Sequence, residues 1–241
     1  MFNFTRKALL KVTNIVVPDS QTQIVRLIAR LNRNVPVISV LDIGGGAGLI
    51  WKNETLLGMI NEGKIVVTVF DAKIGMSSDL TFISGIAPSG LSIFGDNSFD
   101  VCICCDVIEH LPKFEGYNLL YHIERISSME GYLFTPNGFV KQAPEPNNPY
   151  NAHISSWSIN EIRKFGWAHT TGLGGFKFFY SEYGLPKYGS SLKIFHFLLL
   201  GFSLVSRLIV YKLLRRWAYS FSARYSKRNS KNLVDLGRLG S

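Results

Sequence analysis

The sequence predicts an α/β fold with an open, doubly wound and mostly parallel sheet. Short apolar runs of strand length alternate with helical patterns over roughly half of the chain, and this order produces parallel strands with right-handed crossovers. The runs are apolar on both faces, as expected for strands that helices cover on both sides. The 241 residues are 46% hydrophobic, so the chain is long and apolar enough for one sizeable core.

The first helix and the first strand are predicted near the N-terminus. Residues 21–33 carry apolar side chains at helical spacing, and Asp19 or Ser20 can cap their N-terminal end. Pro36 breaks this pattern. The apolar run VISVLDI at residues 37–43 then has the length and composition of a buried strand.

The later elements follow in alternation. Four more strands are predicted at residues 64–71, 80–87, 98–106 and 131–138. Helices are predicted at residues 49–60 and 118–126, and residues 107–114 are expected to open a helix or a turn. A loop rich in proline and asparagine occupies residues 140–153. A last helix is predicted to begin near Ile159, because Ser158 and Glu161 stand at capping-box spacing.

Charge divides the chain into a near-neutral body and a basic tail. The net charge is +9. Residues 187–241 hold eleven lysines and arginines and one acidic residue, whereas residues 1–186 hold 15 basic and 16 acidic residues. The chain carries no nucleic-acid-binding motif, and we expect no nucleic-acid partner. We divide it into a domain at residues 1–186, an apolar and basic segment at 187–221, and a basic tail at 222–241.

Three cysteines, Cys102, Cys104 and Cys105, lie within the predicted fourth strand. They are too close in sequence for ordinary disulfide pairing, and neighbours on a strand point to opposite faces, which disfavours a shared metal ion. We therefore expect buried, reduced thiols and a reducing, cytoplasmic setting. The N-terminal residues do not have the pattern of a secretory signal peptide.

The glycine-rich sequence VLDIGGGAGLI at residues 40–50 follows directly from the first strand. In a doubly wound sheet, a loop in this position borders the ligand site. A phosphate-binding P-loop would need Lys-Ser or Lys-Thr after its glycines, and neither follows Gly48. A dinucleotide fingerprint would need a third Gly or Ala where this chain has Leu49 or Trp51. The remaining pattern is the spacing D-x-G-x-G-x-G, formed by Asp42, Gly44, Gly46 and Gly48.

This spacing resembles the first motif of the class I S-adenosylmethionine-dependent methyltransferases. Three later segments agree with that family in order and spacing: Asp71 at the end of the second strand, SFDVCICCDVIEHLP at residues 98–112, and HISSWSINEIRKFGW at residues 153–167. The resemblance covers residues 20–180 approximately. It implies a Rossmann-like sheet of seven strands, and we place the last, antiparallel strand at residues 222–226, after an apolar helical insertion.

The resemblance also implies S-adenosyl-L-methionine as the cofactor. The glycines would let the backbone approach its zwitterionic amino-acid end, Asp42 would orient donors there, and Asp71 would accept from the ribose hydroxyls. Cys105, at the end of the fourth strand, is a further candidate for cofactor contact. The chain departs from the family at Ile86, near the position where many members carry an acid for the adenine amino group. We expect packing and backbone groups to hold the adenine instead.

Three residues are candidates for removing a proton from the methyl acceptor, namely Asp106, His110 and His153. The first two follow the fourth strand, and His153 ends the proline-rich loop, which can close over a substrate. Asp106, Glu109 and His110 would share a face on a helix. A divalent cation on that face is the alternative to a direct base, but we assign no metal ligand from the sequence. Each histidine also has a purely structural interpretation.

The predicted function is O-methylation of a lipid-linked glycan or another membrane-associated small molecule. A quinone-precursor O-methyltransferase and a non-catalytic, membrane-associated binding protein are the alternatives. The lipid preference depends on residues 192–221, the most apolar stretch of the chain. Its longest run without an ionised side chain is thirteen residues, 194–206, which is too short to span a bilayer. We therefore expect an interfacial helix or helical pair at the inner face of a membrane, and leave the oligomeric state open.

Overall fold

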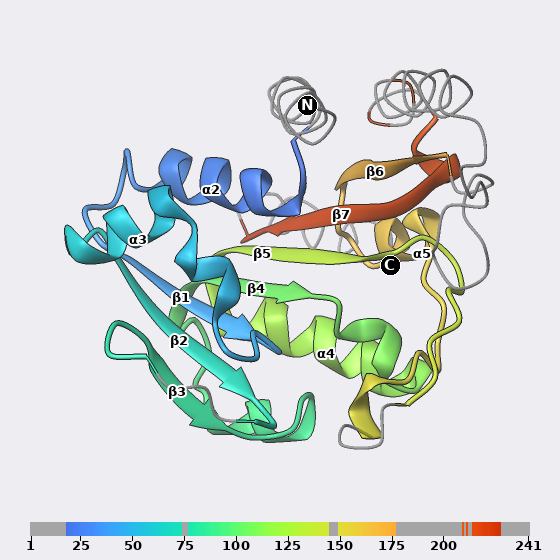
Figure 1. Cartoon of the computed structure of the whole chain (residues 1–241), viewed down its shortest axis with the longest axis horizontal. Coiled ribbons are helices and arrows are strands. Elements are labelled where there is room, and N and C mark those ends of the chain that lie inside the picture. The colour runs from blue at the N-terminus through green and yellow to red at the C-terminus, as the bar shows by residue number, and fades with distance from the viewer. Residues whose placement is uncertain are drawn as a thin grey trace, which may run out of the picture.

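The computed structural model describes residues 18–73, 77–144, 149–176, 209, 211 and 214–227. The strands are β1 (Ile38–Ile43), β2 (Ile65–Asp71), β3 (Thr81–Ser84), β4 (Phe99–Cys105), β5 (Ser127–Pro136), β6 (His169–Phe176) and β7 (Ala218–Ser226). They form one sheet in the order β3-β2-β1-β4-β5-β7-β6 (Figure 1). Strands β1 to β5 pair in parallel, and β7 pairs antiparallel with both β5 and β6. The predicted doubly wound, mostly parallel sheet of seven strands is confirmed.

The helices begin where side-chain caps allow them to begin. In α2 (Ser20–Leu31), the Asp19 carboxylate accepts from the Thr22 N–H at 2.8 Å. In α5 (Ile159–Lys164), the Ser158 hydroxyl accepts from the Glu161 N–H at 3.3 Å. Both N-terminal ends agree with the sequence prediction. The long helix α4 (Lys113–Ile126) begins earlier than the predicted residue 118, directly after Pro112.

The predicted helix at residues 49–60 is divided in two. A 3₁₀ helix, η1, covers Leu49–Lys52, and α3 covers Glu54–Asn61. Asn53 separates them, because its side chain accepts from the backbone N–H groups of Thr55 and Leu56 and starts a new helix there. The prediction missed this because asparagine is tolerated inside a helical pattern.

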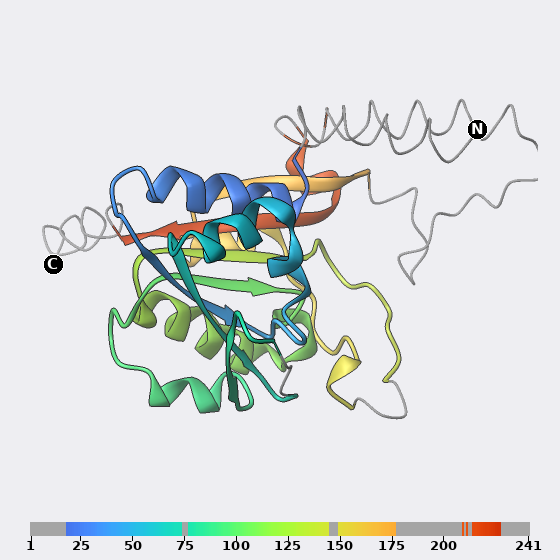
Figure 2. The ribbon, with the colours of Figure 1, turned by 60° about the vertical axis from the view of Figure 1, so that its left-hand side comes forward.

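Helices cover both faces of the sheet (Figure 2). On one face, α2 and α3 pack on a core that contains Ile24, Trp51 and Leu56. On the other face, α4 and α5 pack on a second core that contains Leu119 and Ile162. Successive residues of β1 contribute to the two cores in turn, with Val40 in the first and Leu41 in the second. Burial on both faces is the reason that the strand is apolar throughout.

Strand β7 corrects the expected extent of the membrane segment. The antiparallel strand predicted at residues 222–226 is present, but it begins at Ala218. Phe221 is fully buried beside α5, so residues 218–221 belong to the sheet and not to an interfacial helix. Residues 187–208 of that segment lie outside the described residues. Among the described residues, no helix is long and apolar enough to cross a membrane.

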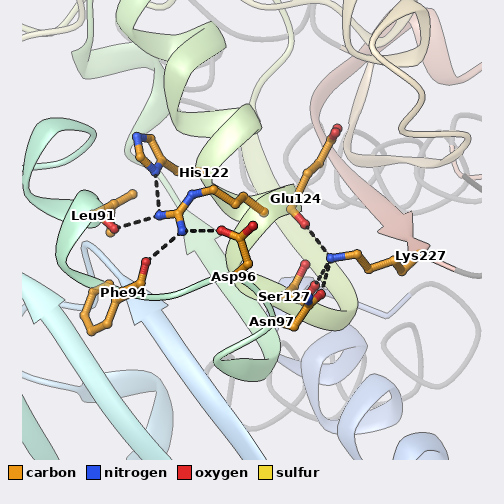
Figure 3. A network of polar contacts seen from close by, with 9 residues as sticks. Leu91, Phe94, Asp96, Asn97, His122, Glu124, Ser127 and Lys227 are labelled. Atoms are coloured by element: carbon orange, nitrogen blue, oxygen red, sulfur yellow. Dashed lines mark hydrogen bonds and ion pairs between the residues drawn. The ribbon is translucent and has the colours of Figure 1, made fainter.

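A polar network ties the end of β7 to the C-terminal end of α4 (Figure 3). The Lys227 ammonium donates to the carbonyl oxygens of Glu124 and Ser127, at 3.3 and 3.0 Å, and to the Asn97 side chain. Arg125, the next residue of α4 after Glu124, donates to the carbonyls of residues 91 and 94 and pairs with Asp96. Cations at this end of a helix satisfy its free carbonyl groups. The network therefore stabilises the edge of the sheet that lies opposite the carboxyl ends of the parallel strands.

Candidate active site

A cavity of about 470 Å³ opens at the carboxyl ends of β1, β2 and β4. Its walls come from five segments, within residues 44–47, 70–73, 85–87, 106–111 and 150–151. Strand β1 has β2 on one side and β4 on the other, which makes this edge the topological switch point of the sheet. In Figure 2 the yellow segment that contains residues 150–151 lies beyond the strand ends on the same side. The volume is that of a small-molecule site.

The turn after β1 exposes backbone to this cavity. Gly44 and Gly46 have φ of 75° and 55°, values that side chains with a Cβ rarely adopt. A Cβ at Gly44 would stand 2.2 Å from a Val107 methyl group. At Gly46 nothing lies within 4 Å of the Cβ position, and this residue lines the cavity. The structure therefore leaves room for a ligand at the backbone of Gly46, and the contact with the cofactor stays a prediction.

Asp71 lies at the end of β2 in the cavity wall, where the sequence placed it. Its Oδ2 accepts from the Gly46 N–H at 2.9 Å, and its Oδ1 accepts from the Lys73 N–H at 2.8 Å. A carboxylate oxygen has a second lone pair, so both oxygens can still accept from the hydroxyls of a ligand. The same carboxylate thus holds the glycine turn and presents acceptors to the cavity.

Asp42 lies beneath the glycine turn and not in the cavity wall. The residue is 3% exposed, and its Oδ2 accepts from the Trp51 indole N–H at 2.7 Å. A Cβ at Gly45 would collide with that oxygen, so the turn packs directly on the carboxyl. Burial raises the pKa of Asp42 to about 6, with a further increase from Asp71 and a decrease from the Trp51 hydrogen bond. Asp42 thus supports the turn from below and does not line the cavity, and its role in orienting donors toward the cofactor stays a prediction.

The wall near β3 is apolar. Phe70, Gly85, Ile86 and Ala87 line it, and Ile86 is 48% exposed. A Cβ at Gly85 would reach within 2.3 Å of the Phe70 ring, so glycine allows the ring and this turn to pack together. None of these four residues is acidic, and a flat ring bound here would depend on packing and on backbone groups.

Two carboxyl groups follow β4. Asp106 lines the cavity with φ of 52°, which is uncommon outside glycine. Glu109 lies in the 3₁₀ turn η3 (Ile108–His110), is 2% exposed, and accepts through Oε2 from the Thr135 hydroxyl at 2.9 Å. Burial raises the pKa of both carboxyls, and Asp106 raises that of Glu109 further. The predicted shared helical face is wrong, because α4 begins only at Lys113.

The two candidate histidines meet beside these acids. The rings of His110 and His153 lie edge to face with centroids 4.7 Å apart. Nδ1 of His110 is 3.0 Å from the Ala152 carbonyl oxygen, and Nδ1 of His153 is 2.7 Å from that of Val140. A carbonyl oxygen only accepts, so each Nδ1 carries the hydrogen, and in the neutral tautomer with this hydrogen bond the lone pair lies on Nε2. Burial lowers the pKa of His110, against the opposing effect of the Ala152 contact.

Backbone hydrogen bonds bring His153 to this place. The N–H groups of Ile154 and Ser155 donate to the Glu109 carbonyl oxygen at 2.9 and 3.0 Å. The Trp157 indole N–H donates to the Ile108 carbonyl oxygen at 3.0 Å. The end of the proline-rich loop is therefore attached to η3, and the two histidines approach each other although a long segment separates them in sequence.

Comparison with known proteins gives matches in structure only. No family model and no curated protein matches the sequence. A SAM-dependent methyltransferase from Archaeoglobus fulgidus is 15% identical, over 90% of this chain and 99% of that one, with a TM-score of 0.47. Magnesium protoporphyrin IX methyltransferase from Synechocystis PCC 6803, with bound SAH, is 17% identical over 85% and 81% of the two chains, at a TM-score of 0.44. Coclaurine N-methyltransferase, bound to N-methylheliamine and SAH, is 14% identical over 87% and 71%, at 0.49.

The deciding observation is the topology of the sheet itself. Five parallel strands in the order β3-β2-β1-β4-β5 are followed by β7, reversed, between β5 and β6. The chain has the class I methyltransferase fold. Sequence identities of 14–17% to these proteins support no conclusion about this chain beyond its fold.

Three further predicted residues, Gly48, Cys105 and His153, do not line the cavity. Gly48 has φ of 68° and packs against Leu80, and it does not line the cavity. Cys105 ends β4 and packs against the core under α2 and α3, and burial raises the pKa of its thiol well above the ordinary value. Gly48 and Cys105 pack behind the cavity wall and are not part of it.

Several cavity residues were not predicted from the sequence, and the polar or loop-borne ones among them include Lys73, Tyr150 and Asn151, with Val107 beside them. Lys73 and Val107 each lie two residues beyond the carboxyl end of a strand, and this position is a signal that could have found them. Tyr150 and Asn151 belong to the proline-rich loop, whose path depends on contacts with η3 that no local pattern reveals.

Proposed function

We propose that this protein is an S-adenosyl-L-methionine-dependent methyltransferase. The observation that carries the proposal is the Asp71 carboxylate at the carboxyl end of β2. It accepts a hydrogen bond from the Gly46 N–H, and both residues line the cavity. Two carboxylates, Asp71 and Asp106, line the cavity beside one lysine, Lys73. This charge disfavours a diphosphate and suits a ligand with ribose hydroxyls and a cationic centre.

The residues fit the cofactor on other grounds as well. Gly46 leaves open space where a side chain would stand, and the apolar surface of Phe70 and Ile86 can pack against adenine. S-adenosyl-L-methionine supplies a methyl group that its sulfonium charge already activates. The chain then has to bring the acceptor into line, exclude water and accept the acceptor's proton.

For a hydroxyl acceptor, we assign the proton to the polar cluster after β4. His110 lines the cavity, contacts His153, and has its Nε2 lone pair free of the Ala152 contact. Burial lowers the pKa of His110, which keeps the ring neutral and able to accept near neutral pH. The cluster acts either directly through this nitrogen or, as argued below, through an ion that its members hold.

Calorimetric titration tests the cofactor. The purified protein is expected to bind S-adenosylhomocysteine, and to show no heat of binding with NADH. The reverse result would make it a nicotinamide-dependent oxidoreductase and overturn the proposal. Binding of neither ligand would favour a non-catalytic protein with the methyltransferase fold.

We further propose that the acceptor is membrane-associated and that a lipid-linked glycan ranks before a quinone precursor. The support is the composition of residues 192–213, which are apolar and basic and would place the protein at the cytoplasmic face of a membrane. The full chain should float with anionic vesicles, and joint replacement of Phe195, Leu199 and Phe202 by serine should abolish this. Replacement of Phe114, an exposed side chain of α4, is the matched control. A wild-type chain that does not float would remove the membrane proposal.

Mass spectrometry identifies the acceptor class. Lipids, glycans and quinones from cells with and without the gene are compared, and one product is expected to lose a single methylene unit in mass. A change confined to quinones would favour the alternative acceptor.

A further inference from the structure

Three side chains near the cavity form an arrangement that methyl transfer alone does not require. Glu109, His110 and His153 each offer one ligand atom, and these atoms lie within 4.8 Å of one another. They come from η3 and from the loop that returns to it. Ligand atoms around one ion with bonds of about 2.0–2.2 Å lie roughly 3–4 Å apart, so only a small closing movement separates this group from a coordination shell.

The carboxyl of Glu109 has an unexplained oxygen. The residue is 2% exposed, and although Oε2 accepts from Thr135, Oε1 has no hydrogen-bond partner among the described residues. A buried carboxyl oxygen without a partner is unfavourable. Coordination of a cation would satisfy it.

The two histidines are oriented as metal ligands are. Each donates Nδ1–H to a backbone carbonyl oxygen, that of Ala152 for His110 and that of Val140 for His153. Such outer contacts select the tautomer in which Nε2 is available, and they accompany most protein metal sites. Glu109 has the equivalent outer contact with Thr135. All three groups are therefore held in place by a second interaction.

A purely structural role explains less. A Glu109 that is protonated beside Asp106 would account for the raised pKa of both acids, but no hydrogen bond of ordinary geometry then satisfies Oε1. It also gives no reason for one ligand atom of each histidine to lie within 4.8 Å of the carboxyl and of the other histidine.

We propose that Glu109, His110 and His153 bind one divalent transition-metal ion, such as Zn²⁺, Mn²⁺ or Fe²⁺. Two imidazoles and one carboxylate suit these ions, whereas Mg²⁺ and Ca²⁺ prefer oxygen ligands throughout. His110 also lines the cavity, whereas Glu109 and His153 lie behind it, so an ion held by the three would lie at the cavity wall. Resting on the proposed function, the ion lowers the pKa of an acceptor hydroxyl or of one member of a vicinal diol and orients it. The acceptor's proton passes to solvent or Asp106, its oxygen bonds the methyl carbon, and the sulfur–methyl bond breaks with its electron pair left on sulfur.

The test uses the full chain after chelation, without cofactor. Titration calorimetry with Mn²⁺ and Zn²⁺ should show one site, and Mg²⁺ should bind at least about tenfold more weakly. His153→Ala and Glu109→Gln should each weaken Mn²⁺ binding by about 10–100-fold or more, the effect that even outer contacts of metal sites reach. His122→Ala is the matched control, because His122 contacts Arg125 in the network at the other end of α4 (Figure 3) and should bind Mn²⁺ like the wild type.

A second readout separates coordination from folding. Co²⁺ added to the wild type should give a visible absorption band, which His153→Ala should lose while its circular dichroism and its binding of S-adenosylhomocysteine are retained. Absence of an ion site in the wild type, or variants that bind Mn²⁺ as tightly as the wild type, would overturn the proposal. Ion binding is measured without cofactor, so a protein that fails to bind S-adenosylhomocysteine could still confirm the ion site. Likewise, a protein without an ion site could still bind S-adenosylhomocysteine.

Discussion

Asp42→Asn tests whether the carboxyl beneath the glycine turn makes stability depend on pH. The pKa of Asp42 is raised by burial to about 6 from the ordinary value of 3.8. A group whose pKa is higher in the folded state contributes stability below its unfolded pKa, and this contribution is lost as pH rises through the folded value. Two pKa units correspond to about 3 kcal/mol. The wild type should therefore lose up to about 3 kcal/mol of unfolding free energy between about pH 4 and 6 through this group.

Urea unfolding at a series of pH values from 4 to 7 provides the measurement. Asparagine at position 42 cannot ionise but retains an oxygen for the Trp51 indole N–H, so the difference from wild type isolates the titration. The unfolding free energy of the variant, measured relative to that of the wild type at the same pH, should therefore be higher above pH 6 than at pH 4. Trp51→Phe is the companion variant, because loss of the hydrogen bond that lowers the pKa should move the loss of stability to higher pH. Parallel curves for wild type and Asp42→Asn would refute the reasoning.

Three further predictions concern the cofactor turn and the network in Figure 3. Asp71→Ala should weaken binding of S-adenosylhomocysteine by about 10–100-fold, since a hydrogen bond to a charged group contributes roughly 1.5–3 kcal/mol; equal affinity in a calorimetric titration would contradict the ribose assignment. Gly46→Val should abolish that binding, because a branched side chain would be forced to φ of 55° and into the cavity, and a variant that still binds would show that the cofactor lies elsewhere. Lys227→Met should lower the unfolding free energy by about 1–2 kcal/mol, through loss of its contacts with the carbonyls of Glu124 and Ser127, and leave cofactor affinity unchanged. An unaltered urea midpoint would remove the capping role.

Much of the fold was predictable because its signals are local. The apolar strands, the caps at Asp19 and Ser158, and the glycine turn follow from patterns a few residues long. The division of one predicted helix at Asn53 and the early start of β7 at Ala218 were missed. The cap at Asn53 is local but is hidden in an otherwise helical pattern, whereas the start of β7 depends on pairing with the distant strand β5.

The site was predictable in part. Asp71 lies in the cavity wall beside Gly46, as the sequence indicated. Asp42 does not, because burial of Trp51 under the turn places an indole donor on its carboxyl. Asp106 and His110 line the cavity. The φ of 52° at Asp106 is not helical, so Asp106 and Glu109 do not lie on one helix as the sequence pattern suggested.

The sequence by itself determined the strands, the order of elements and the glycine turn that borders the cavity, because hydrophobic periodicity and glycine spacing act over short distances. Only the tertiary structure decided that His153 stands against His110 beside the buried carboxyl of Glu109. That meeting depends on the N–H groups of Ile154 and Ser155 pairing with the Glu109 carbonyl oxygen. Backbone hydrogen bonds between distant segments carry no side-chain signature, so they are visible in the folded chain and not in its sequence.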